Sequence, residues 1–147
     1  MSEEEAWAFL AAGHTAVLTT LRRDGWPVSL PLWYVVQDRA IYVGTPTRSK
    51  KVERIRNDDR GCLLVERGEA WADLAAVELP VRATILGSGP EADRAEAAFA
   101  DKYAAFRPAP SRMPSATNEH YSGRTMVRLD PAGSLISWDN SRIRLRG

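Results

Sequence analysis

The sequence has few of the residues on which several classes of site depend. It contains one cysteine, Cys62, and two histidines, so neither an internal disulfide nor a Cys/His metal site is expected. No apolar run approaches the roughly 20 residues that a helix needs to cross a bilayer. The start, MSEEEAWAFL, is acidic, whereas secretion signals begin with basic residues. We therefore expect a protein of the reducing cytoplasm with no metal and no membrane contact.

The overall charge also lacks a strong bias. Lys and Arg number 20 against 19 Asp and Glu, which gives a net charge of +1. Domains that bind the nucleic-acid backbone usually carry a clear basic excess, so nucleic acid is not an expected partner. Among the basic residues only three are Lys and 17 are Arg, a proportion typical of GC-rich genomes.

The length of 147 residues fits one domain, which we expect to span 1–147. A capped, acidic start predicts a helix over 3–12, and helical spacing with an alanine-lined face predicts the clearest helix over 91–105. Strands are expected at 15–21, 27–36, 40–44, 61–66, 124–129 and 134–139, with a further long strand contained within 70–86 and bent at Pro80. A short helix is expected within 45–60 and a loop over 107–123. Strands at this density favour a small barrel.

The segment 45–60 carries the most informative chemistry. Six positive charges lie between Arg48 and Arg60, beginning where a strand gives way to a helix. Unpaired backbone N–H groups and the helix dipole favour an anion at such a point. The side chains suited to a phosphate are Thr45, Thr47, Arg48, Ser49, Lys50, Lys51 and Arg54. The alternative is an exposed helix face whose charges pair with Glu53 and Asp58.

A second candidate segment is the strand that Pro31 interrupts. Proline cannot donate to a ladder, so the strand is expected to have an edge, a bulge or a non-strand neighbour there. Ser29 and Trp33 share one face, where a planar heterocycle could lie against backbone amides. Packing in the core is the alternative for Trp33.

Three stretches resemble a known family. The run VSLPLWYVVQDRAIYVGTPTRSKKVERIRNDDRGCLLVE is similar to the first half of the split β-barrel proteins related to pyridoxamine phosphate oxidase. Within them it is most similar to flavin/deazaflavin oxidoreductases of group B, the actinobacterial branch that uses coenzyme F420. The ending VRLDPAGSLISWDNSRIRL and the helix end DKYAAF also resemble that branch, although its members often carry proline where Ala104 stands.

The resemblance implies a mainly β (α+β) split barrel of the FMN-binding type that forms a homodimer with two cofactor sites at the interface. Coenzyme F420 is the implied cofactor and FMN the alternative. The excess of Arg favours F420, because actinobacteria commonly make it. Arg48–Lys51 would bind the phosphate and the acidic tail, and Ser29, Leu30, Pro31 and Leu32 would flank the ring. Trp138, Asn140 and the 107–121 loop would approach from the other protomer.

The implied function is an oxidoreductase that transfers a hydride from the reduced deazaflavin to a small conjugated or heteroaromatic substrate. Since the cofactor carries the reactive hydride, the protein has to bind, orient and exclude water. No catalytic residue is assigned, and His120 and Tyr121 are only candidates for a proton donor. The alternatives are an FMN-binding oxidoreductase of the same fold and a non-catalytic protein that binds its cofactor, haem or a fatty acid.

Overall fold

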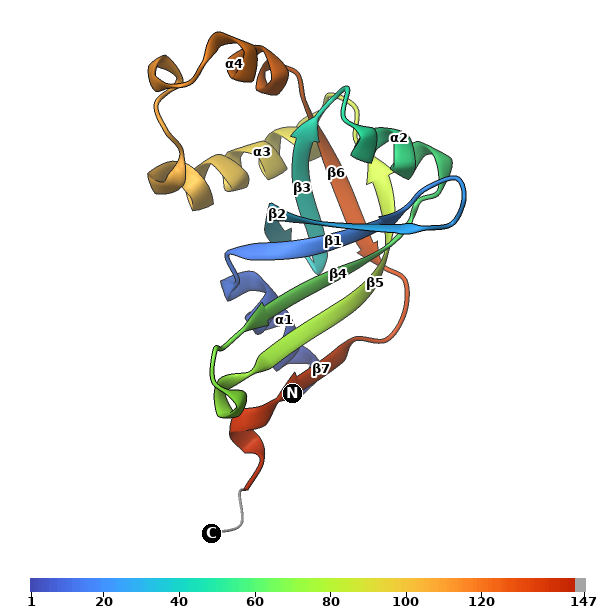
Figure 1. Ribbon diagram of the computed structural model, residues 1–147, viewed down its shortest axis with the longest axis vertical. Coiled ribbons are helices and arrows are strands. Elements are labelled where there is room, and N and C mark those ends of the chain that lie inside the picture. Colours follow the sequence, from blue (N-terminus) through green and yellow to red (C-terminus); the bar gives the residue numbers. More distant parts are fainter. Residues whose placement is uncertain (145–147) are drawn as a thin grey trace.

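The computed structural model describes residues 1–144, except for the side chains of Pro110, Asn118 and residues 120–122. Within this range seven strands form one antiparallel sheet (Figure 1). Their bounds are β1 Thr15–Leu21, β2 Pro27–Gln37, β3 Ala40–Pro46, β4 Arg60–Arg67, β5 Ala75–Ile85, β6 Arg124–Pro131 and β7 Ile136–Asp139.

The sheet closes into a barrel of six strands. β1 pairs with β2, β2 with β3, β3 with β6, β6 with β5, β5 with β4, and β4 with β1 again. β7 adds to the first part of β5. Closure pairs the edges that an open sheet would expose. The predicted mainly β (α+β) split barrel is confirmed.

β5 changes its partner at Pro80. Ala75–Glu78 pair with β7, and Val81–Ile85 pair with β6. Proline has no N–H to donate, so it suits the point at which one edge of the strand passes from one partner to the next. We predicted a bend at Pro80. In the structure Pro80 lies within one continuous strand, and the neighbouring strand on one side changes there from β7 to β6.

Helix α1 (Glu3–Ala12) contributes to the barrel core. The Ser2 hydroxyl accepts from the N–H of Glu5, and the Glu5 carboxylate accepts from the N–H of Ser2, which is a capping box. Ala6 and Leu10 are buried with the inward residues of the barrel strands, among them Leu18.

Helix α3 (Pro90–Tyr103) packs outside the barrel on β2, β3 and β6. Its Ala95, Phe99 and Tyr103 are buried in a second apolar cluster with Val35 and Met126. The Tyr103 hydroxyl accepts from the N–H of Tyr34 at 2.9 Å and lies within donating distance of the carbonyls of Tyr34 and His14, at 2.7 and 2.8 Å. This hydroxyl therefore joins α3 to β2 and to the chain before β1.

The other helices are short. They are α2 Lys50–Asn57 and α4 Ser115–Ser122, with 3-10 turns η1 Trp71–Asp73, η2 Ala104–Phe106, η3 Pro110–Arg112 and η4 Asn140–Arg142. The prediction of a loop over 107–123 is therefore wrong for α4. Its eight residues follow Pro114, which stands at the N-cap position. None of the helices in residues 1–144 is long and apolar enough to span a membrane.

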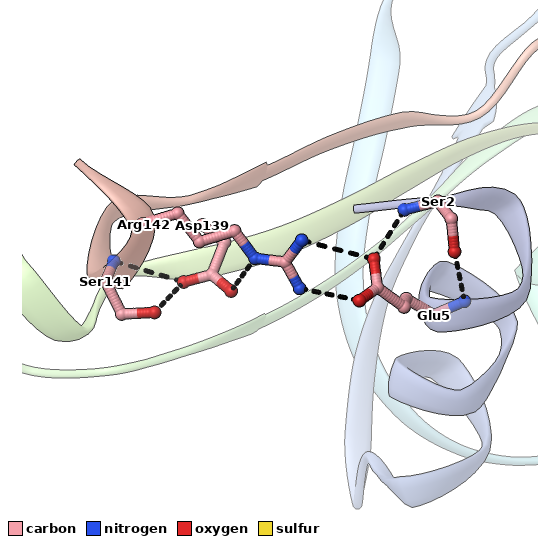
Figure 2. Close-up of polar contacts among 5 residues, drawn as sticks. All are labelled: Ser2, Glu5, Asp139, Ser141 and Arg142. Carbon is pink, nitrogen blue, oxygen red and sulfur yellow. Dashed lines mark hydrogen bonds and ion pairs between the residues drawn. The ribbon is translucent and has the colours of Figure 1, made fainter.

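An ion-pair cluster ties the end of the chain to its start (Figure 2). Arg142 lies 2.9 Å from Glu5 and 3.1 Å from Asp139. Asp139 also accepts from the N–H of Ser141, at 3.1 Å, and so caps η4. Hydrogen bonds and ion pairs with Arg142 and Ser2 lower the pKa of Glu5 to about 2. In Figure 1 this cluster lies at one end of the molecule, and α2, α3 and α4 lie toward the other.

Candidate functional site

A cavity of about 430 Å³ lies beside α1, and a larger one of about 610 Å³ lies where β2, β3, α2, α3 and the chain after α3 meet. The larger cavity is lined by residues of the predicted basic segment, among them Thr45 and Lys51, and its volume is within the range of small-molecule sites. Its described lining residues are Pro31, Leu32, Trp33, Gly44, Thr45, Pro46, Lys51, Phe99, Arg107, Pro108, Met113 and Arg124. Among these, three are cationic and none is acidic. The lining thus combines an apolar, partly aromatic wall with positive charge.

The free edge of β2 forms part of the wall. β2 pairs with β1 along Pro27–Trp33 but with β3 only along Tyr34–Gln37. The first part of the strand therefore has no β3 neighbour, and Pro31 lies within it. A free edge is one of the three arrangements that were expected for this proline. Leu32 and Trp33 follow it in the lining.

The turn into α2 is held by its hydroxyl groups. Ser49 is the N-cap, and its hydroxyl accepts from the N–H of Val52 at 3.3 Å. The hydroxyl of Thr45 lies 3.1 Å from that of Ser49. The hydroxyl of Thr47 lies 2.8 Å from that of Thr125 on β6. These side chains fix the turn against β3 and β6, and Thr45 also lines the cavity.

The basic residues of this segment have three different surroundings. Lys51 lines the cavity and is half-buried, and burial, with a smaller effect of Arg54, lowers the pKa of its ammonium. Arg48 and Lys50 are exposed beside it. Arg54 donates from Nε to the buried hydroxyl of Thr20 at 2.8 Å, so it anchors α2 to β1. Lys51 is therefore the member of the predicted cluster that reaches the cavity wall.

Arg124 is a site residue that the sequence did not reveal. Its Cζ lies 4.2 Å from the centre of the Phe99 ring, and its Nη1 lies 3.5 Å from a carboxylate oxygen of Glu96. Its Nη2 is buried and has no hydrogen-bond partner among the described residues. Burial lowers the pKa of the guanidinium, although Glu96 acts in the opposite direction.

Some predicted residues lie outside the described lining. The hydroxyl of Ser29 lies 2.8 Å from that of Thr19, and the side chain of Leu30 is 44% exposed. Trp138 on β7 is also 44% exposed, and the amide of Asn140 donates to the carbonyl of Trp71 at 2.7 Å. β7 and η4 lie toward the opposite end of the molecule from α2 (Figure 1). A role for Trp138 and Asn140 from a second protomer stays a prediction.

The segment after α3 contributes to the cavity wall. It was expected to reach the site of the other protomer, but Arg107, Pro108 and Met113 line the cavity of their own chain. An approach of the 107–121 loop to the site of another protomer stays a prediction. The side chains of His120 and Tyr121 are outside the described part of the structure.

Several residues that line the cavity were not predicted from the sequence, and they lie far apart in it. Pro46 and Arg124 are opposite each other in the β3–β6 register, so pairing of distant strands brings Arg124 to the site. Phe99 follows the helical spacing that predicted α3, but that spacing predicts burial and does not distinguish a cavity wall from a core. Arg107 begins the 107–121 loop that was expected to approach the site of the other protomer, and for Gly44 we find no sequence signal.

Comparison with protein families gives a match over residues 2–137 to the model described as pyridoxamine 5'-phosphate oxidase. The chain belongs to this family. Comparison with curated proteins finds no match. Family membership agrees with the resemblance seen in the sequence and with the closed barrel, and it leaves the subgroup open.

Solved structures share the fold. Protein Rv2991 from Mycobacterium tuberculosis is 26% identical, with a TM-score of 0.79, over 100% of this chain and 93% of that one. An F420 reductase is 16% identical, with a TM-score of 0.66, over 88% and 94%. A haem-binding protein from Mycobacterium smegmatis is 21% identical, with a TM-score of 0.68, over 93% and 57%. The last two similarities show the fold alone.

Proposed function

We propose that this protein is an oxidoreductase that binds coenzyme F420 and transfers a hydride from its reduced form to a small conjugated or heteroaromatic substrate. The observation that carries the proposal is the 610 Å³ cavity, whose described lining has an aromatic wall, three cations and no carboxylate. A planar cofactor with anionic substituents matches both properties.

The residues present fit such a cofactor. Lys51 offers an ammonium at the start of α2, where the backbone N–H groups also favour an anion. Arg48 and Lys50 add exposed positive charge beside it for a longer acidic tail. Leu32 and Trp33, on the free edge of β2, offer a surface against which a ring can lie. These residues would bind the cofactor by its phosphate and by its ring.

When bound, the deazaflavin supplies the hydride-transfer chemistry, and the protein supplies binding and orientation. The aromatic and apolar wall would exclude water and align the two ring systems. The chain's positive charges would offset negative charge on the bound molecules. No side chain is assigned as a proton donor.

We further propose that two copies of the chain form the working unit, with Trp138 and Asn140 of the second copy completing the site. Trp71 and Trp138 are 54% and 44% exposed, and Ile136 and Ile143 beside them are also exposed. A group of large apolar side chains at one end of a small protein suits an interface.

Two alternatives have support of their own. FMN carries a phosphate and a planar ring, so the same cavity residues suit it. The haem-binding protein with this fold supports a non-catalytic carrier as the second alternative. Binding without turnover would favour the carrier.

The test is turnover of the reduced cofactor. The full chain is mixed with reduced F420 and, in turn, with quinone, nitro-aromatic and tetrapyrrole acceptors, and oxidation of the cofactor is followed by its absorbance. We expect oxidation that depends on the protein and on at least one acceptor. Tight binding of F420 with no turnover across the panel would contradict the proposed activity.

A further inference from the structure

The cavity carries a second cationic cluster apart from Lys51. Arg107 and Arg124 both line it, and their Cζ atoms lie 5.6 and 4.2 Å from the centre of the Phe99 ring. Lys51 lies on the first turn of α2, whereas Arg124 lies 3.5 Å from Glu96 of α3 and shares the Phe99 ring with Arg107. The cations therefore form two groups on the wall, one at α2 and one around Phe99.

Arg124 has a donor that the protein does not use. Its side chain is only 20% exposed, and Glu96 approaches Nη1, while Nη2 is buried and has no partner in the part of the chain that the structure describes. A buried N–H group of a cation without an acceptor is unfavourable. An acceptor that enters with a ligand would remove this deficit.

The neighbouring strand leaves room for the guanidinium. A Cβ at Gly44 on β3 would lie 2.3 Å from Nε and 2.6 Å from Nη2 of Arg124. Any side chain at Gly44 would therefore displace Arg124. The glycine makes it possible for the guanidinium to lie over Phe99 at the cavity wall.

We infer that Arg124, together with Arg107, binds the carboxylate of a planar aromatic or conjugated substrate. The inference rests on the proposed function, which assigns the cofactor phosphate to the group around Lys51. A guanidinium binds a carboxylate through paired charge-assisted bonds, and aromatic side chains bind the flat part of the same molecule. Glu96 offsets part of the charge of Arg124, and Arg107 supplies a second positive charge. The site thus selects for an anionic acceptor.

The test compares two probes of the same shape and different charge. Naphthalene carboxylate and its uncharged carboxamide are titrated by calorimetry into the full chain, alone and with saturating F420. We expect the carboxylate to bind at least about tenfold more tightly, as a charge-assisted hydrogen bond allows. Arg124→Gln should reduce this preference to about twofold or less while the affinity for F420 changes by less than about twofold.

Two further variants test the same site if Arg124→Gln does not fold. Arg107→Gln alters an exposed side chain, and Gly44→Ala should expel the guanidinium without changing its charge. Both should lower the preference for the carboxylate. Thermal unfolding of each variant shows whether it is folded.

The outcomes separate this inference from the proposed function. No preference for the carboxylate in the unaltered protein overturns the inference. So does a loss of F420 and FMN binding in Arg124→Gln as large as in Lys51→Gln, because Arg124 would then bind the cofactor. If neither cofactor binds but the carboxylate preference depends on Arg124, the proposed function fails and the anion site stands.

Discussion

At the scale of single residues, the positive charges of this chain differ in what surrounds them. Arg48 and Lys50 are exposed, Arg54 is bonded to Thr20, and Lys51 lies in the cavity wall. The sequence predicted one cluster because the residues are adjacent. Their side chains diverge because Arg48 precedes α2, and because the helix points Lys50, Lys51 and Arg54 in different directions.

Lys51→Gln tests which of these charges matters. Because Lys51 lines the cavity and is partly desolvated, its loss should weaken binding of F420 and of FMN by about tenfold or more. Arg56→Gln, an exposed residue on the same helix, is the matched control and should change binding by less than about twofold. Quenching of tryptophan fluorescence measures both. Equal losses in the two variants would mean that long-range charge, and not the cavity contact, governs affinity.

At the scale of elements, α3 depends on one buried hydroxyl. Tyr103 is fully buried, and its hydroxyl bonds to the backbone of Tyr34 and lies within donating distance of the carbonyl of His14. Tyr103→Phe should lower the free energy of unfolding by about 1–3 kcal/mol, because the N–H of Tyr34 loses its buried acceptor. Urea denaturation measures the change. An effect no larger than that of Tyr42→Phe, which removes one partly buried bond to Glu91, would contradict this role.

The cluster around Arg142 makes a prediction about pH. The pKa of Glu5 is lowered from 4.5 to about 2 in the fold, so its contribution to stability is present above about pH 4.5 and is lost as pH falls toward 2. Arg142→Ala removes the main cause. The difference in Tm between the unaltered protein and Arg142→Ala should therefore shrink between pH 6 and pH 2.

The control for the Arg142 prediction is Arg22→Ala, which removes an exposed ion pair within one turn and should show a small difference in Tm. A difference for Arg142→Ala that stays constant down to pH 2 would show that the ion pair with Glu5 does not stabilise the fold.

The elements themselves were largely predictable, and the site only in part. The alternation of apolar and polar residues in strands and the helical spacing of apolar residues are local properties of the sequence. The strands, α1, α2 and α3 could therefore be predicted from it. The prolines between Pro108 and Pro114 obscured α4, because they interrupt the helical pattern and read as a loop. Arg124 reaches the cavity only through the β3–β6 pairing, which no local pattern indicates.

At the scale of the whole molecule, we propose that a second copy of the chain completes the site. Trp138 lies on β7, toward the opposite end of the molecule from the cavity (Figure 1), so only another protomer could bring it to the cofactor. We predict that sedimentation gives twice the chain mass of 16.3 kDa. We also expect Trp138→Ala to weaken F420 binding.

If the unaltered protein sediments as a monomer and still binds F420, one chain suffices to form the site. Trp26→Ala is the control, because Trp26 is an exposed tryptophan on the β1–β2 turn and is not among the predicted contacts. It should leave F420 binding unchanged.

The central claim is that the cavity beside α2 binds a deazaflavin. The most direct measurement is a side-by-side titration of the full chain with F420 and with FMN, followed by quenching of tryptophan fluorescence, to which Trp33 in the cavity wall contributes. We predict that F420 binds more tightly than FMN and that Lys51→Gln weakens its binding. Tighter binding of FMN, or no binding of either molecule, would contradict the claim.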